Sequence, residues 1–226
     1  MLRAIILFTF FLITAATGHT QTFYGGLFPE IAVSTKIGKG YKYTFKVESM
    51  HGLFFDNEAV NKDWNYFHDR TDLQTFISHK LTPFQNLTLG MQYRVEEGHN
   101  TFRSIQQISF VVLRDHARMG HRIRADQTYL PDASDQYRIR YRFSYEKPLQ
   151  GLDLNPGEIY LILSDEVIYS YVPSESDMEN RINIAIGYYQ NATNKFQIGI
   201  DFRTDKILEP GSRNRAWLKM GWYTNI

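Results

Sequence analysis

Apolar and polar residues alternate with a period of two through most of the chain after about residue 30. Such alternation is typical of β-strands whose two faces meet different surroundings. The most regular windows are 87–96, 137–146, 181–188 and 196–203. Weaker windows follow the same rule at 31–37, 41–49, 73–81, 108–113, 119–129, 159–171 and 216–226. The pattern therefore predicts an all-β protein, initially with eleven strands.

The links between these windows alternate in length, as in a transmembrane up-and-down antiparallel β-barrel with tight turns at one rim and longer loops at the other. Short links are predicted at 38–40, 82–86, 115–117 and 191–194, and longer ones at 51–71, 96–102, 130–136, 172–180 and 207–213. The link 147–157 is an exception, because it is long but falls on the short side. Both termini of such a barrel normally lie on one side of the membrane, so the strand number should be even. Residues 22–28 can supply the missing strand, and we expect 12 strands, with 10 as the alternative.

The first 18 residues have the features of a secretory signal peptide. Arg3 is followed by a stretch of apolar and small residues from Ile5 to Ala16, and more small residues come next. The stretch is too short to cross a bilayer of about 30 Å as a helix. We therefore expect residues 1–18 to be removed on export and residues 19–226 to form one outer-membrane barrel domain.

Charge and composition exclude several classes of protein. Removal of Arg3 with the leader leaves 24 basic and 24 acidic residues, whereas a nucleic-acid-binding protein normally has a basic excess. The chain contains no cysteine, so it has neither a disulfide framework nor a lipidation site in the leader. The sequence has no P-loop, HExxH or GxSxG motif and no clustered metal ligands. We therefore expect no metal and no cofactor.

The polar face of the strands distinguishes a membrane barrel from a soluble one. That face is rich in arginine and glycine, whereas strands that face water more often use lysine. The apolar face gathers tyrosines and Trp222 toward the strand ends, as aromatic girdles do at membrane interfaces. We therefore expect the apolar face to contact outer-membrane lipid and the arginines to point into a lumen. The alternative is a soluble periplasmic β-barrel binding protein with the two faces inverted.

The last window, 216–226, alternates up to Ile226. It resembles the final strand of bacterial outer-membrane barrels, which the barrel-assembly machinery recognises, although that signal usually ends in an aromatic residue. The resemblance implies that the barrel-assembly machinery is a partner. The oligomeric state is left open.

The chain after the leader also resembles a family of uncharacterised, porin-like bacterial outer-membrane barrels that is known as a domain of unknown function. The resemblance rests on four segments: EIAVSTKIGKGYKYTFKVES at 30–49, FISHKLTPFQNLTLGMQYR at 76–94, RIRYRFSYEKPL at 138–149 and LSDEV at 163–167. It covers most of the chain. It implies a location in the outer membrane and a barrel architecture, but no activity.

A cluster of arginines is the main candidate site. A turn near 131–134 should place residues 122–126 opposite residues 138–142 on the inner face. Like charges that face each other across a sheet are destabilising, so carboxylates should interleave, and Glu146 and Glu166 are suited to this. The candidates for the lumen or for a ligand are Arg94, Arg122, Arg124, Asp126, Arg138, Arg140, Arg142 and Glu166.

Two hypotheses account for this cluster. One is an ion-paired plug that fills the lumen, and the other is an anion-selective path or a binding site for an acidic ligand. Barrels of about 8 strands are filled by side chains, whereas open porins have about 16 to 18, so the predicted size favours the plug.

Asp165 does not fit a regular strand. Strict alternation sends it to the same face as Leu161 and Leu163, at a cost of up to a few kcal/mol in the middle of a membrane. We therefore predict a β-bulge near Ser164 that turns Asp165 or its neighbour toward the arginines.

The longest predicted loop, 51–70, is rich in aromatic residues, which often mark a binding surface when exposed. They would equally suit a lid over the barrel mouth. The candidates are Phe54, Phe55, Trp64, Tyr66 and Phe67.

An outer-membrane lipid hydrolase or acyltransferase is the enzymatic alternative, and it requires a Ser and a His that converge on one surface. Ser78 and His79 are neighbours on one strand and must face opposite sides, and His121 has no Ser in reach. His51 and His68 are expected in a loop. We therefore expect a barrel that is not an enzyme, whose role is structural or is the permeation or binding of small anions.

Overall fold

The computed structural model describes residues 22–57, 60–130, 134–173, 175–209 and 211–226. The leader predicted at 1–18 lies outside these residues. The described residues form an all-β structure and contain no helix that is long and apolar enough to cross a membrane.

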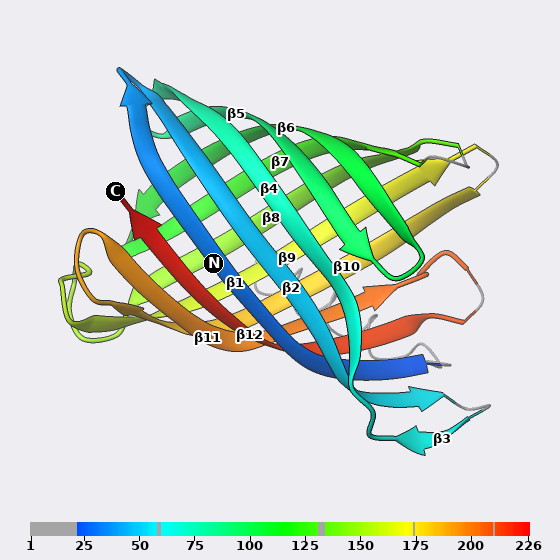
Figure 1. Cartoon of the computed structure of the whole chain (residues 1–226). Coiled ribbons are helices and arrows are strands. Elements are labelled where there is room, and N and C mark those ends of the chain that lie inside the picture. The colour runs from blue at the N-terminus through cyan, green and yellow to red at the C-terminus, as the bar shows by residue number, and fades with distance from the viewer. Residues whose placement is uncertain (1–21, 58–59, 131–133, 174, 210) are drawn as a thin grey trace.

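Twelve strands occur in the described residues (Figure 1). They are β1 (Thr22–Gly38), β2 (Tyr41–Asn57), β3 (Val60–Asp63), β4 (Phe67–Thr82), β5 (Gln85–Glu96), β6 (His99–Arg114), β7 (Ala117–Tyr129), β8 (Gln136–Pro148), β9 (Glu158–Val172), β10 (Glu175–Tyr189), β11 (Asn194–Asp205) and β12 (Arg213–Asn225).

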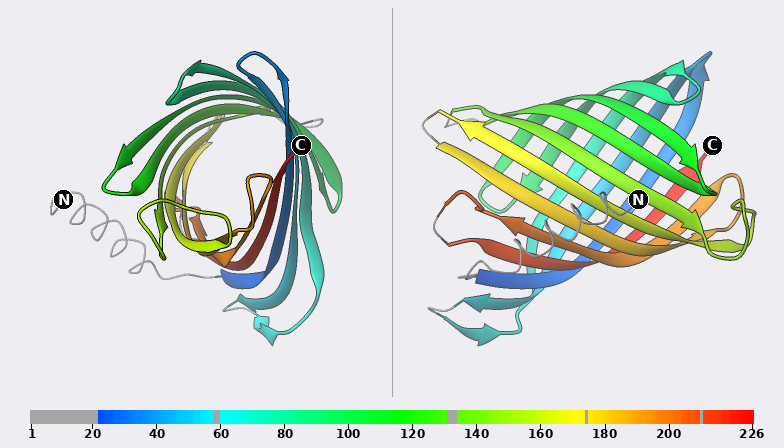
Figure 2. Two further views of the ribbon diagram at one scale, coloured as in Figure 1. Left: turned by 90° about the vertical axis from the view of Figure 1, so that its left-hand side faces the viewer. Right: turned by 180° about the vertical axis from the view of Figure 1, so that it is seen from behind.

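Eleven of these strands form a closed barrel (Figure 2). Each strand from β4 to β11 pairs with the next, β2 pairs with β4, and β1 pairs with both β2 and β12. The short strand β3 pairs only with β2 among the described residues and lies outside the ring. All barrel pairs are antiparallel except β1 and β12, which run parallel from Thr22 opposite Arg213 to Ser34 opposite Asn225. The barrel therefore closes through one parallel pair.

The expectation of 12 barrel strands is not confirmed, and the described residues give eleven. Residues 22–28 are not a separate strand, because they are the first part of β1. A register shift between Gly25 and Gly26, where Leu53 is an extra residue in β2, does not end β1. A Cβ atom on Gly26 would lie 2.0 Å from the carbonyl oxygen of His51, so only glycine allows this approach. The parallel pair removes the need for an even strand number.

The two rims differ less than predicted. We call the rim that contains the turn between β1 and β2, at residues 39–40, the turn rim. The opposite rim, where β3 pairs with β2, is the flap rim. At the flap rim only Glu97 and Gly98 separate β5 from β6, and β9 ends at Val172 while β10 begins at Glu175. Long links were predicted at both places. The strands continue beyond their apolar windows because backbone hydrogen bonds extend a hairpin whatever the side chains are.

The interior of the barrel is polar and its outer surface is apolar. Among the described residues, forty large apolar side chains are exposed, while the buried set contains twelve apolar and eighteen polar or charged residues. This is the opposite of the arrangement that a soluble barrel with inverted faces requires. The alternation in the sequence therefore places the arginines inside, as predicted.

Two clusters of buried apolar side chains lie in the interior, one toward each rim. Tyr24, Phe28, Met50 and Trp217 form one buried cluster on the first part of β1 and its neighbours, on the flap-rim side. A second cluster lies where β9 begins and β10 ends, at the turn rim, and consists of Tyr160, Ile162 and Ala185 with Leu154 and Tyr189 packed against them.

The β-bulge predicted near Ser164 is wrong. β9 pairs with β8 and β10 without a register shift, and Asp165 lies opposite Phe143 and Ile182. Asp165 therefore shares the outer face with its apolar neighbours. Its Oδ1 accepts a hydrogen bond of 2.7 Å from the side-chain amide of Asn180.

Candidate functional site

The predicted pairing of the arginine-rich strands is confirmed. Arg122 lies opposite Arg142, Arg124 opposite Arg140, and Asp126 opposite Arg138 on β7 and β8. The hairpin brings these side chains together because both strands place every second residue inside the barrel.

Two buried carboxylates hold the arginines in place. Glu166 on β9 accepts hydrogen bonds from Arg122 at 2.5 Å and from Arg142 at 3.1 Å. The side chain of Glu166 is only 1% exposed. Each oxygen of this carboxylate accepts from one guanidinium group. The carboxylate therefore lies between two cations that would otherwise repel each other.

Asp126 has the same role one layer nearer the flap rim. Its carboxylate lies 2.7 Å from Arg138, 2.8 Å from Arg140 and 3.5 Å from Arg103. Because this carboxylate has no exposed surface, its charge is balanced by these three cations rather than by water.

Of the two carboxylates expected to interleave, Glu166 does so and Glu146 does not. Glu146 pairs with Arg118 at 3.2 Å near the turn rim, where Arg118 is 53% exposed. The two residues face each other where β7 begins and β8 ends. The sequence pattern identified the correct face for Glu146 but not its distance from the cluster.

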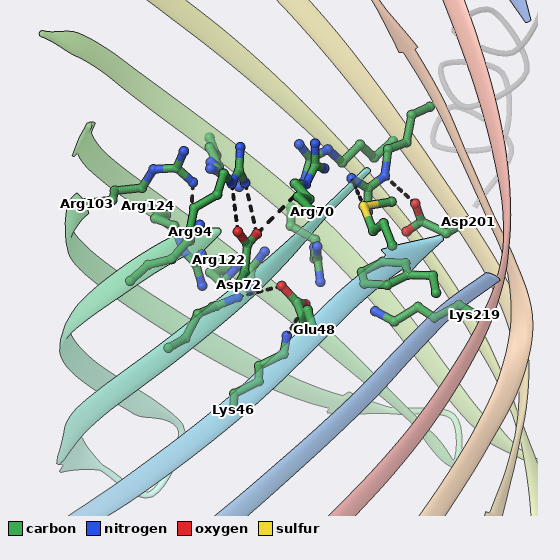
Figure 3. Close-up of a pocket in the computed structure, with 18 residues that line it drawn as sticks. Lys46, Glu48, Arg70, Asp72, Arg94, Arg103, Arg122, Arg124, Asp201 and Lys219 are labelled. Carbon is green, nitrogen blue, oxygen red and sulfur yellow. Dashed lines mark hydrogen bonds and ion pairs between the residues drawn. The ribbon is translucent and has the colours of Figure 1, made fainter. Parts of the chain in front are cut away.

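The other wall of the lumen is built by β2, β4 and β5 (Figure 3). Arg94 donates two hydrogen bonds to Asp72, at 2.7 and 2.9 Å. Glu48 accepts a hydrogen bond from Gln74 and forms an ion pair with Lys46, both at 2.5 Å. This wall is therefore cross-linked from strand to strand by charged hydrogen bonds.

Several lumen residues were missed by the sequence analysis. Arg70 lies in the segment predicted to be the longest loop, and Arg103 lies between the predicted link 96–102 and the window 108–113. The structure places them in β4 and β6. Arg203 lies at the end of the window 196–203, on the polar face, but was not among the predicted site residues. It pairs with Asp201 at 2.5 Å, and its guanidinium group lies 5.1 Å from the ring of Phe28.

Arg124 differs from its neighbours because no carboxylate of the described residues lies within ion-pair distance of it. Its Nε and Nη2 atoms donate to the side-chain oxygen of Gln107, at 3.1 and 2.9 Å. Its guanidinium group lies 5.7 Å from the ring of Phe76. Gln107 supplies no negative charge, so the charge of Arg124 is not balanced by a direct partner.

The arginines surround a central cavity of about 60 Å³ (Figure 3). Eleven of its eighteen lining residues are Lys or Arg, and three are Asp or Glu. Polar cavities of about 280 Å³ and 370 Å³ lie toward the flap rim and the turn rim, and each shares lining residues with the central one. The lumen is therefore narrowest, and most positive, at the arginine layer.

The aromatic residues of segment 51–70 do not form one surface. Phe55 and Phe67 pack against Tyr24 of the interior cluster, with ring centroids 6.2 and 6.0 Å away. Phe54 instead contacts Trp64 at 5.1 Å, and Trp64 and Tyr66 are largely exposed. The binding and lid hypotheses for these rings remain predictions, and Phe55 and Phe67 contribute to the interior.

Two histidines lie in strands rather than in a loop. His51 is in β2 and His68 is in β4, and the two are paired across the sheet. Ser78 and His79 lie side by side in β4 and so point to opposite faces, as predicted. His121 hydrogen-bonds to Tyr141 at 2.8 Å.

These features define a closed, almost entirely antiparallel β-barrel with an apolar exterior and an arginine-rich, ion-paired interior. The chain belongs to the family described as a protein of unknown function, DUF2490, whose model matches residues 26–206. Comparisons with the curated proteins and with the solved structures found no match.

Proposed function

We propose that this chain is an outer-membrane β-barrel whose closed lumen binds small anions. The observation that carries the proposal is the combination of an apolar exterior with a cationic interior. Burying apolar surface in lipid is favourable, whereas leaving forty large apolar side chains in water is not. The interior would then supply the polar face that membrane barrels turn toward their lumen.

Aromatic side chains support this orientation. Tyr41 and Tyr188 are exposed near the turn rim, and Tyr93, Tyr137 and Tyr171 are exposed toward the flap rim. Rings with one polar end favour the headgroup zone on each side of a bilayer. The two sets would therefore mark the two membrane interfaces.

The last strand fits recognition by the barrel-assembly machinery. Leu218, Met220 and Trp222 are exposed on the outer face of β12. This outward apolar row is the feature that resembles the terminal strand of outer-membrane barrels.

Asp165 is the residue that fits this orientation least. An ionised carboxylate that faces lipid costs up to a few kcal/mol, depending on depth. The hydrogen bond from Asn180 offsets part of that cost.

Anion binding is supported by the excess of cations at the central cavity. Arg124 has no carboxylate partner among the described residues, and the Nε atoms of Arg122 and Arg142 have no hydrogen-bond partner there. Buried positive charge that is only partly balanced is costly, and a small anion would offset that cost. The narrow cavity and the apolar clusters on either side favour a closed lumen over an open pore.

Membrane insertion is tested by heat-dependent mobility. After mild detergent extraction, the folded barrel should migrate differently in cold SDS and after boiling. Release of the protein by osmotic shock without detergent would contradict the proposal.

Anion binding is tested with phosphate as the probe and with Arg124→Gln as the variant. A ligand at 100 times its Kd stabilises the folded state by about 2.7 kcal/mol, so phosphate should raise the urea midpoint of the wild-type protein. Arg124→Gln should lose most of this shift, and Arg118→Gln, at the rim, should keep it. An equal shift in both variants would contradict a site at Arg124. A large, stable conductance in planar bilayers would contradict a closed lumen.

A further inference from the structure

A chain of hydroxyl and imidazole groups runs across the outer face of β2 and β4 near the flap rim. Ser49 Oγ lies 2.9 Å from His51 Nε2, and His51 Nδ1 lies 2.9 Å from the hydroxyl of Tyr66. On the other side, Ser49 Oγ lies 2.8 Å from the hydroxyl of Thr71, which lies 2.9 Å from His68 Nε2. The order of the hydrogen-bonded groups is therefore Tyr66, His51, Ser49, Thr71, His68.

A β-bulge brings these groups to one face. Ser49 lies opposite Thr71, but Met50 pairs with Arg70 and His51 pairs with His68, so Asp69 is an extra residue in β4. Strict alternation from Arg70, which lines the central cavity, would send His68 inward. The extra residue turns His68 to the outer face instead.

We propose that Ser49 and His51 form a nucleophile and general-base pair that cleaves the acyl esters of membrane lipids. A serine is activated when an imidazole within hydrogen-bond distance accepts its proton and a further group orients that imidazole. When His51 donates its Nδ1 proton to the Tyr66 oxygen, Nε2 is free to accept the proton of Ser49. Tyr66 is thus a positioning residue.

The reaction proceeds in two steps, acylation of Ser49 and hydrolysis of the acyl–serine ester. Ser49 Oγ attacks the ester carbonyl carbon while its proton passes to His51 Nε2, and His51 then protonates the departing lysolipid alcohol as the ester bond breaks. Water next attacks the acyl–Ser49 ester and gives a proton to His51, and that proton returns to Ser49 Oγ as the fatty acid leaves. The Thr71 hydroxyl lies beside the attacking oxygen and is suited to donate to the carbonyl oxygen as it becomes negative.

The position of the cluster indicates the substrate class, and this step rests on the proposed membrane location. Directly toward the turn rim on the same outer face are Phe45, Val47 and Leu73, of which Phe45 and Leu73 are exposed. An acyl chain would lie along these side chains, with its ester at the boundary between hydrocarbon and headgroups. Polar groups cost little at such a boundary, so the hydroxyl and imidazole groups can lie beside the lipid esters there.

The barrel itself supplies matched controls. His121 and Tyr141 form a similar hydrogen-bonded His–Tyr pair at 2.8 Å, without a serine among their hydrogen-bond partners in the described residues. Ser78 has a hydroxyl bonded to Thr88, at 2.9 Å, and points away from His79.

The first test is labelling by a fluorophosphonate, in which Ser49 Oγ displaces fluoride from phosphorus. The full chain, refolded in vesicles of phosphatidylethanolamine and phosphatidylglycerol, should be labelled at Ser49. Ser49→Ala and His51→Ala should lose the label, whereas Ser78→Ala and His121→Ala should keep it. Absence of the label in the wild type, or its persistence in Ser49→Ala, would overturn the proposal.

The second test is the release of fatty acid from the same vesicles. His51→Ala should reduce the rate by roughly 10²- to 10⁴-fold, the usual contribution of a general base. Tyr66→Phe should lower kcat more than it changes KM, because Tyr66 orients the base and does not bind lipid. Heat-dependent mobility in SDS, measured on every sample, reports membrane insertion separately from this chemistry. Hydrolysis of a soluble nitrophenyl ester by an inserted barrel that releases no fatty acid from the vesicles would overturn the assignment of lipid as substrate.

Discussion

Replacement of Glu166 by Gln tests whether the interior is held together by charge. The substitution keeps the shape of the side chain, so it creates no cavity, but it removes the charge shared by Arg122 and Arg142. Loss of one partner from a buried ion pair costs about 3–5 kcal/mol, because the remaining charge stays buried. Since a folded domain is stable by about 5–15 kcal/mol, Glu166→Gln should remove a large part of the stability.

Glu146→Gln is the matched control. Glu146 also pairs with an arginine across β7 and β8, but Arg118 is 53% exposed. Exposed pairs contribute about 0–1 kcal/mol, so this variant should behave almost like the wild type. Comparing the two variants distinguishes the effect of leaving a buried charge unpaired from the effect of losing any ion pair.

The measurement is reversible urea unfolding in phospholipid vesicles, followed by tryptophan fluorescence. Trp217 is fully buried in the interior cluster, so its emission reports the integrity of the barrel. The loss in Glu166→Gln should shrink when phosphate is added, because a bound anion can replace the missing carboxylate. The reasoning is refuted if Glu166→Gln lies within about 1 kcal/mol of the wild type, or if Glu146→Gln loses as much.

Three further predictions concern the outer face, the packing and the orientation of the barrel. Asp165→Asn should raise the free energy of unfolding in vesicles by about 1 kcal/mol, because it removes a charge from the lipid-facing side, and a loss of stability would contradict that exposure. Gly187→Val should lower it by about 1–3 kcal/mol, since a Cβ there would lie 2.2 Å from the Tyr160 ring, and an unchanged urea midpoint would contradict this packing. In outer-membrane barrels the short turns face the periplasm, so we expect the turn rim there and the flap rim outside the cell. Because the chain has no native cysteine, an impermeant maleimide should then label Lys206→Cys at the flap rim of intact cells and Asn155→Cys only after permeabilisation, whereas the reverse result would contradict this orientation.

In β7 and β8 the local pattern was sufficient to predict which residues face inside. The alternation in β8 assigns Arg138, Arg140 and Arg142 to one face, and the turn before it sets their partners on β7. Both depend on a period of two and on one hairpin, which are short-range properties of the chain. The interleaving of Glu166 also follows, because like charges that face each other are destabilising and a carboxylate between them offsets the repulsion.

The closure of the barrel and the meeting of distant groups depend on long-range pairing. The parallel pairing of β1 with β12 joins strands from the two ends of the chain, and no local pattern specifies it. Asp126 meets Arg138 and Arg140 across one hairpin, and Arg103 joins them because β6 pairs with the other edge of β7.

The geometry of the pair formed by Ser49 and His51 likewise depends partly on the local sequence and partly on the pairing of strands. Their spacing of two residues places both on one strand face, which the sequence alone determines once β2 is known to continue that far. Their contact with Tyr66 and with the side chains of β4 depends on an extra residue in the pairing of β2 with β4. A bulge shifts one strand against its neighbour, so its effect is set by the tertiary structure and cannot be read from the period of either strand alone.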